Sequence, residues 1–312
     1  MKQNKRKVTK KDNTRALKFL TPSLISMAIL SFAPIIYTIY IAFTDYNLKT
    51  MNTGWGFVGL KNFKDILTGP LKEIFVPVFI WTFVCATLIT LGCFIVGLIF
   101  ALVLSNKNMK ESSLYKAFLI IPWALPGAII IVAFTGLLNS QYGAINEILM
   151  NLHLIKEPIM WLTEVGPARV AVVLISIWLG FPYMMNVCIG ALSSIPDTYY
   201  EAADIDGANM FQKFFKITLP SLATTAFPLL IGSWSFNFGG FSTAFLLLGG
   251  GPVRPDTPFA GYTDMLGSAA YKMTTQFGRF ELGAAMSIVM FLIVGSIAFA
   301  QMKASGQFKE VD

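Results

Sequence analysis

Charged residues are scarce in this chain of 312 residues, and the scarcity excludes most classes of soluble protein. Only 13% of the residues are Asp, Glu, Lys or Arg, whereas 55% are hydrophobic and 14% are aromatic. A soluble domain of this size carries about 25% charged residues, so the polar side chains here are too few to cover a water-exposed surface. The composition therefore excludes a soluble enzyme, a nucleic-acid-binding module and a disordered scaffold.

Residues that bind metals, form disulfides or bind nucleotide phosphates are also few. The three cysteines lie inside apolar stretches without a Cys-x-x-Cys spacing, and His153 is the only histidine. This pattern excludes a zinc site and an extracellular disulfide framework, so we expect no metal and no cofactor in the chain. The sequence also lacks the Gly-x-x-x-x-Gly-Lys-Ser/Thr phosphate loop. We expect separate subunits to bind any ATP.

Six long uncharged stretches account for nearly half of the chain. Each has at least 21 residues. A helix that rises about 1.5 Å per residue crosses a hydrocarbon core of about 30 Å with roughly that number. We therefore predict an all-α integral membrane protein with six transmembrane helices, over 19–43, 77–104, 117–138, 170–193, 221–248 and 282–302.

Basic residues gather at one end of the chain, and their position predicts its orientation. Eight of the 24 lysines and arginines lie within residues 1–18. If that segment is cytoplasmic, the inner segments carry 15 basic residues and the outer segments carry 8. Cytoplasmic segments normally carry the excess of Lys and Arg. We predict cytoplasmic termini, with a basic tail over 1–18, a six-span domain over 19–302 and a second tail over 303–312.

Three segments are expected on the outer side. Residues 44–76 predict a turn followed by a short amphipathic helix, and 139–168 predict a surface helix near Ile145 to Leu154. The third segment, 249–281, opens with three glycines and Pro252, so it cannot begin as a helix.

The fourth and fifth stretches each carry polar residues on one helix face. Their members follow the spacing i, i+3, i+4, i+7, and they are Ser176, Leu179, Gly180 and Tyr183 on the fourth stretch, and Ser233, Phe236, Asn237 and Gly240 on the fifth. Hydroxyl and amide groups beside aromatic rings suit a neutral polyhydroxylated ligand. Small residues and single amides also pack membrane helices against each other. The spacing alone leaves both interpretations open.

None of the six stretches contains Asp, Glu, Lys, Arg or His. A proton- or ion-coupled carrier usually keeps a carboxylate or histidine at membrane depth, and a secondary sugar carrier is expected to show internal repeats as well. A membrane-embedded enzyme would need acid, base or metal groups near the membrane. Energy for any transport is therefore expected to come from another subunit.

The segment 194–220 holds the most informative pattern. A helix ended by Gly207 and a second from about Ala208 to Ile217, stopping before Pro220, would form a helix–turn–helix that projects into the cytoplasm. The pattern E-A-A-x-x-x-G, followed after nine residues by I-x-L-P, resembles at every defined position the coupling loop of permease subunits of binding-protein-dependent ABC importers. That resemblance implies ATPase-coupling residues at Glu201, Ala202, Ala203, Gly207, Ile217, Leu219 and Pro220.

Further stretches narrow the resemblance to the larger permease subunits of maltose/maltodextrin importers. They are 178–185, 211–220, 236–238, 257–264 and 280–285. The resemblance covers most of the chain from about Ser105 to Lys303 and implies the type I ABC-importer permease fold. It implies substrate-binding residues at Trp123, Ser176, Leu179, Gly180, Tyr183, Ser233, Phe236, Asn237 and Gly240.

Three of these positions depart from the family pattern. Ser176 and Gly240 stand where the maltose permease has asparagines, and Trp123 stands where it has a tyrosine. Two amide partners are lost while an aromatic surface is kept. The identity of the sugar is therefore left open.

The resemblance implies the membrane-spanning subunit of an ATP-driven importer of a malto-oligosaccharide or related oligosaccharide, working by alternating access in the cytoplasmic membrane. The implied partners are a second permease subunit, two copies of an ATP-binding subunit, an extracellular solute-binding protein, the oligosaccharide and the lipid bilayer, with no nucleic acid. A permease for another sugar, such as a galacto-oligosaccharide, and a secondary sugar carrier are the alternatives.

Overall fold

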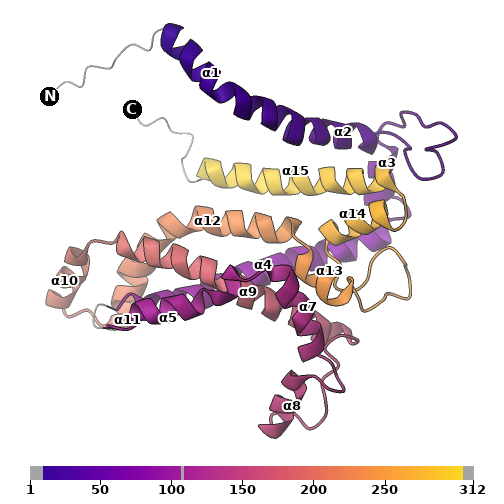
Figure 1. The fold of residues 1–312 in the computed structure, drawn as a ribbon. Coiled ribbons are helices and arrows are strands. Elements are labelled where there is room, and N and C mark those ends of the chain that lie inside the picture. The colour runs from indigo at the N-terminus through magenta and orange to yellow at the C-terminus, as the bar shows by residue number, and fades with distance from the viewer. Residues whose placement is uncertain (1–9, 107–108, 305–312) are drawn as a thin grey trace.

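The computed structural model describes residues 10–106 and 109–304, and most of these residues are helical (Figure 1). The longest helices are α4 (Lys72–Leu104), α9 (Val165–Ser193) and α15 (Phe280–Ala304). The other α-helices are α1 (Lys10–Met27), α2 (Ala33–Ala42), α3 (Lys61–Leu67), α5 (Ser112–Leu119), α6 (Ile121–Ala124), α7 (Gly127–Leu137), α8 (Ala144–Asn151), α10 (Asp197–Ile205), α11 (Met210–Lys213), α12 (Leu219–Gly239), α13 (Ser242–Leu248) and α14 (Leu266–Thr275). The π-helical segments Ala28–Phe32 and Phe214–Thr218 join α1 to α2 and α11 to α12, respectively. Within the described ranges no strand forms, and one isolated bridge joins Thr44 to Phe57.

Four helical segments in the described part of the chain are long and apolar enough to cross a membrane. They are Leu17–Ala42, Lys72–Leu104, Val165–Ser193 and Phe280–Lys303. The segments Met210–Thr224 and Ala226–Leu248 together qualify as a fifth, with a bend of 60° between them. The structure thus contains four or five apolar spans, while the count of six and the cytoplasmic termini stay predictions.

The third predicted span, 117–138, is not one helix. It is divided among α5, α6 and α7, and the chain is extended at Leu125, where ψ is 151°. Pro122 and Pro126 lack the backbone N–H that a continuous helix needs, and a proline also drives the residue before it toward an extended conformation. The expectation of a continuous helix here is therefore wrong.

The fifth predicted span, 221–248, is also broken. Helix α12 ends at Gly239, and ψ is 153° at Gly240, before α13 begins at Ser242. Two consecutive glycines weaken a helix because they have the largest backbone entropy to lose. The break turns the first residues of α13 toward α9, where Thr243 meets Ser176.

Helices α4 and α9 pack along most of their length and form the centre of one apolar core. Their backbones approach closely at Gly97, where an added Cβ would lie 2.7 Å from the backbone nitrogen of Met185. Within a membrane, moving a leucine side chain from lipid into a helix interface gains little, because lipid is equally apolar. Close packing at small residues such as Gly97 therefore stabilises the helix pair.

A second core joins α2, α14 and α15. Helix α3 packs against α4 and α15, with Ile66 only 1% exposed. The buried Asn62 donates from Nδ2 to the carbonyl oxygens of Ala42 at 2.9 Å and Thr44 at 2.7 Å. The amide therefore fixes the start of α3 to the end of α2.

The segment that precedes α14 is held against α4. Trp81 donates from Nε1 to the carbonyl of Thr263 at 3.2 Å, and the N–H of Leu266 donates to Thr82 Oγ1 at 2.9 Å. The buried Asp264 accepts from Lys272 Nζ at 2.5 Å and from the Ser268 hydroxyl at 2.7 Å. As expected from the glycines and prolines, no helix begins between 249 and 265.

Figure 1 shows α10 and α11 at one end of the molecule, the same end as the start of α1 and the end of α15. Helices α3 and α14 lie at the opposite end, and α8 projects away from the bundle. The predicted surface helix near 145–154 corresponds to α8, and the predicted amphipathic helix after 60 corresponds to α3.

Candidate functional site

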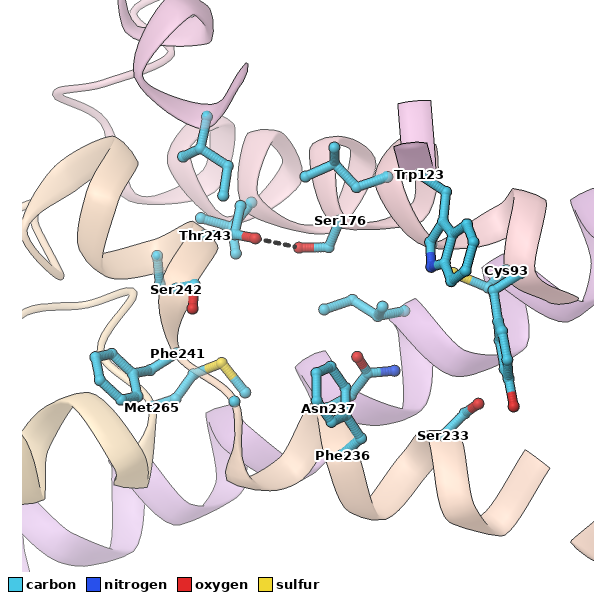
Figure 2. A pocket seen from close by; sticks show the side chains of 18 of the residues that line it. Cys93, Trp123, Ser176, Ser233, Phe236, Asn237, Phe241, Ser242, Thr243 and Met265 are labelled. Atoms are coloured by element: carbon cyan, nitrogen blue, oxygen red, sulfur yellow. Dashed lines mark hydrogen bonds between the residues drawn. The ribbon is translucent and has the colours of Figure 1, made fainter. Parts of the chain in front are cut away.

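A cavity of about 590 Å³ lies among α9, α12 and α13 (Figure 2). Residues of α4, α6 and α7, together with Met265, complete its wall. The structure brings all nine predicted substrate-binding residues to this wall: Trp123, Ser176, Leu179, Gly180, Tyr183, Ser233, Phe236, Asn237 and Gly240. Their role in binding stays a prediction, but their convergence is a fact of the fold.

Helix α9 contributes the first predicted face. Gly180 lines the cavity and also allows α9 to approach α4, because an added Cβ would lie 2.8 Å from Cys93 Sγ. Tyr183 is 39% exposed, and its ring centroid lies 6.4 Å from that of Trp123 at an interplanar angle of 31°. The two rings present apolar faces at one end of the cavity.

Trp123 reaches the cavity because the third predicted span is broken. It lies in the short helix α6, between Pro122 and the extended Leu125, and is 56% exposed. Aromatic rings of this kind bind the apolar faces of a ligand, and tyrosine adds a hydroxyl at its end.

Helix α12 contributes the second predicted face. Asn237 donates from Nδ2 to Thr90 Oγ1 of α4 at 2.9 Å, and this bond orients the amide. The amide oxygen Oδ1 can then accept from a ligand. Phe236 is 80% exposed, and Figure 2 shows its ring beside Asn237 with Ser233 further along the same helix.

Further lining residues were not assigned from the sequence. They include Cys93 on α4, Met265, and the run Phe241, Ser242 and Thr243 that leads into α13. Ser176 donates from Oγ to Thr243 Oγ1 at 3.0 Å, which joins α9 to α13. The Gly239-Gly240 pair was the available signal for α13, because it predicts a break that redirects the chain.

No charged side chain lines the cavity among the residues that the structure describes. Apolar and aromatic groups form most of the wall, and hydroxyl and amide groups supply the hydrogen bonds. Such a wall is chemically suited to a neutral ligand that has both hydroxyls and apolar ring faces. It offers no carboxylate, histidine or lysine for general acid–base chemistry.

The predicted coupling loop forms two short helices, α10 and α11, at one end of the molecule (Figure 1). Gly207 has a φ of +73°, as expected for a glycine that ends a helix. Its N–H donates to the carbonyl of Asp204 at 3.1 Å, and that of Ala208 donates to Ala203 at 2.8 Å. This pair of bonds terminates α10 and redirects the chain to α11.

The second part of the loop differs from the expectation of a helix that stops before Pro220. Helix α11 continues through a π-helical turn, Phe214–Thr218, into α12. Pro220 is the second residue of α12 and follows the π-helical turn directly. The N–H of Leu219 bonds to the carbonyl of Phe214, a wider spacing than in an α-helix.

The loop presents most of its motif residues to the outside. Glu201, Ala202, Gly207 and Pro220 are exposed, whereas Ala203, Ile217 and Leu219 are half-buried. Within the loop, Lys213 forms an ion pair with Asp204, and the Tyr200 and Thr218 hydroxyls lie 2.9 Å apart. Contacts within the loop therefore hold it together, and most of its motif residues stay accessible.

These features define a multi-pass membrane protein with an internal uncharged cavity. Residues 93–307 match the family described as binding-protein-dependent transport system inner membrane component. The chain belongs to this family of transporter components, which confirms the family predicted from the coupling-loop pattern.

The chain is similar to named transport proteins over most of its length. It is 37% identical over 299 residues to the galactooligosaccharides transport system permease protein GanP of Bacillus subtilis, covering 93% of this chain and 69% of that protein. It is 40% identical over 253 residues to the maltose/maltodextrin transport system permease protein MalF of Salmonella typhimurium. That alignment covers 80% of this chain but spans only about half, 49%, of MalF.

Two solved structures share the fold. A chain in the crystal structure of a bacterial ABC transporter involved in the import of the acidic polysaccharide alginate aligns with a TM-score of 0.78 and 21% identity, covering 96% of this chain and 98% of that chain. A chain in the alginate transporter in complex with an alginate pentasaccharide-bound periplasmic protein aligns at 0.75 and 20%, covering 96% of each. The predicted all-α ABC-permease fold is confirmed.

Proposed function

We propose that this chain is the membrane-spanning subunit of an ATP-driven importer that moves a neutral oligosaccharide across the cytoplasmic membrane. The supporting observation is that nine positions chosen from the sequence line one uncharged cavity. Hydroxyl and amide groups there can hydrogen-bond sugar hydroxyls, and Trp123, Tyr183 and Phe236 can lie against sugar rings.

A malto-oligosaccharide or related sugar is the proposed substrate. MalF proteins are 38–40% identical to this chain, and Tyr183 and Asn237 supply neutral hydrogen-bonding groups. An acidic sugar is disfavoured, because the described cavity wall has no cation to pair with a buried carboxylate. This distinguishes the proposal from the alginate importers with the same fold.

A galacto-oligosaccharide is the second candidate. GanP is 37% identical over 93% of this chain, and its name states that it transports galactooligosaccharides. The neutral cavity suits either sugar, and the specificity depends on which hydroxyls its polar groups meet.

The proposed complex contains a second permease subunit, two ATP-binding subunits below the membrane and an extracellular solute-binding protein. The α10–α11 loop would dock on the ATP-binding subunits. Closure of those subunits on ATP, favoured by the loaded binding protein, would rock the helices and open the cavity to one side at a time. Each ligand shifts the equilibrium only as far as it prefers one state.

The test is sugar uptake by the assembled complex in proteoliposomes, with ATP inside and the loaded solute-binding protein outside. Maltotriose, β-1,4-galactotriose and a trisaccharide of uronic acids are compared. We expect ATP-dependent uptake of a neutral sugar and none of the uronate. Uptake of the uronate alone, or uptake independent of ATP, would overturn the proposal.

A further inference from the structure

Two hydroxyl groups form a pair on the cavity wall. Ser176 Oγ of α9 and Thr243 Oγ1 of α13 lie 3.0 Å apart, and both residues line the cavity. Figure 2 shows this pair facing the cavity across from Phe236 and Asn237. Both side chains are half-buried, so a ligand in the cavity can reach them.

Two other hydroxyls on the long helices bond within their own helix. Thr82 donates to the carbonyl of Val78 at 2.7 Å, and Ser287 donates to that of Gly283 at 2.9 Å, each one turn earlier in its own helix. Ser176 and Thr243 instead bond to each other across two helices. The two hydroxyls carry two protons and their mutual bond uses one, so the second proton can be donated to a ligand.

The opposite wall offers complementary chemistry. The Nδ2 group of Asn237 is bonded to Thr90, which leaves its oxygen as an acceptor toward the cavity. The hydroxyl pair thus supplies a donor on one side and Asn237 an acceptor on the other. A sugar hydroxyl both donates and accepts, so a sugar ring between these walls can satisfy both.

We propose that Thr243, held by Ser176, is a specificity-determining residue that binds one hydroxyl of the transported sugar. This inference rests on the proposed transport of a neutral oligosaccharide. A site that hydrogen-bonds a substrate hydroxyl discriminates strongly against an analogue that lacks it, because the polar group of the protein is then left unpaired. The pair would therefore select sugars by the presence of a hydroxyl at one ring position.

The test uses the complete transporter in proteoliposomes with its solute-binding protein and ATP. The probes are maltotriose and β-1,4-galactotriose, each with its set of monodeoxy derivatives. Thr243→Val removes the hydroxyl and keeps the branched shape. We expect uptake of the full sugar per assembled complex to fall about 2- to 12-fold, the effect of one lost hydrogen bond. The native transporter should take up the full sugar faster than one monodeoxy derivative. In Thr243→Val, the ratio of these two uptake rates should fall toward one.

Matched variants separate binding from packing. Thr243→Ser keeps the hydroxyl and should keep the preference, whereas Ser176→Ala removes its partner and should weaken the preference for the full sugar over the same derivative. Thr274→Val makes the same substitution at a half-buried threonine of α14 outside the cavity, and it should leave every ratio unchanged.

The inference would be overturned if Thr243→Val preferred the full sugar over every monodeoxy derivative as strongly as the native transporter does. A fall in the amount of complex, with native uptake and native preference per complex, would overturn it as well. Uptake by the native transporter reports on the proposed function, and the change in preference reports on Thr243, so the two failures are distinguishable.

Discussion

Asn237 is the polar residue on which the proposed binding depends most. Its Nδ2 bond to Thr90 fixes the amide, so its oxygen is already oriented before a ligand enters. We expect Asn237→Leu to lower sugar uptake per assembled complex by more than about tenfold, because it removes a ligand bond and leaves the sugar hydroxyl unpaired against an apolar side chain. Thr90→Val keeps the acceptor oxygen of Asn237 but removes the bond that orients it, so it should lower uptake by less.

Uptake, corrected for the amount of complex in the membrane, checks this order. Tyr183→Phe, which removes one hydroxyl, should have a modest effect of about 2- to 12-fold. Native uptake per complex in both Asn237→Leu and Tyr183→Phe would show that these side chains only pack.

Gly180 lines the cavity and also lies where α9 packs against α4. Because an added Cβ would lie 2.8 Å from Cys93 Sγ, Gly180→Ala should destabilise the α4–α9 contact by about 1–3 kcal/mol. Adding Cys93→Ala removes the sulfur and should restore the amount of folded complex measured by detergent extraction and size-exclusion chromatography. No recovery in the double variant would contradict the steric explanation.

At the scale of elements, Gly207 connects backbone conformation to the proposed coupling. Its φ is +73°, and nothing lies within 4 Å of an added Cβ, so a substitution there is penalised through the backbone alone. Valine in this conformation costs about 1 kcal/mol or more, whereas asparagine tolerates it better. We expect Gly207→Val to uncouple ATP hydrolysis from uptake, and Gly207→Asn to retain coupling.

The ratio of ATP hydrolysed to sugar imported measures this coupling. Normal ratios in Gly207→Val would argue that α10 and α11 do not require this turn to engage the ATP-binding subunits.

Sequence patterns predicted the helices better than their continuity. Spacing identified the faces of α9 and α12, because a regular helix repeats every 3.6 residues. Apolar content alone did not reveal the breaks at Leu125 and Gly240, although Pro122, Pro126 and the glycine pair were available signals. Contacts such as Trp81 with Thr263 join residues 182 positions apart, and no local pattern predicts them.

At the scale of the whole molecule, the six-span topology is the main untested prediction. The start of α1, the end of α15 and the α10–α11 loop lie at one end of the structure, as expected if all three are cytoplasmic (Figure 1). Reporters fused to the C-terminal end and inserted near Glu111 should therefore be cytoplasmic, and one inserted near Glu157 should be external. An external C-terminal reporter beside a cytoplasmic reporter near Glu111 would mean that the spans between them have been miscounted.

A structure of the assembled transporter, stalled with its sugar, tests the central claim most directly. We predict density for the sugar between α9 and α12, with a hydroxyl within hydrogen-bonding distance of Asn237 and a ring face against Trp123 or Tyr183. Sugar bound elsewhere in the complex, with this cavity empty or filled by side chains, would contradict the account.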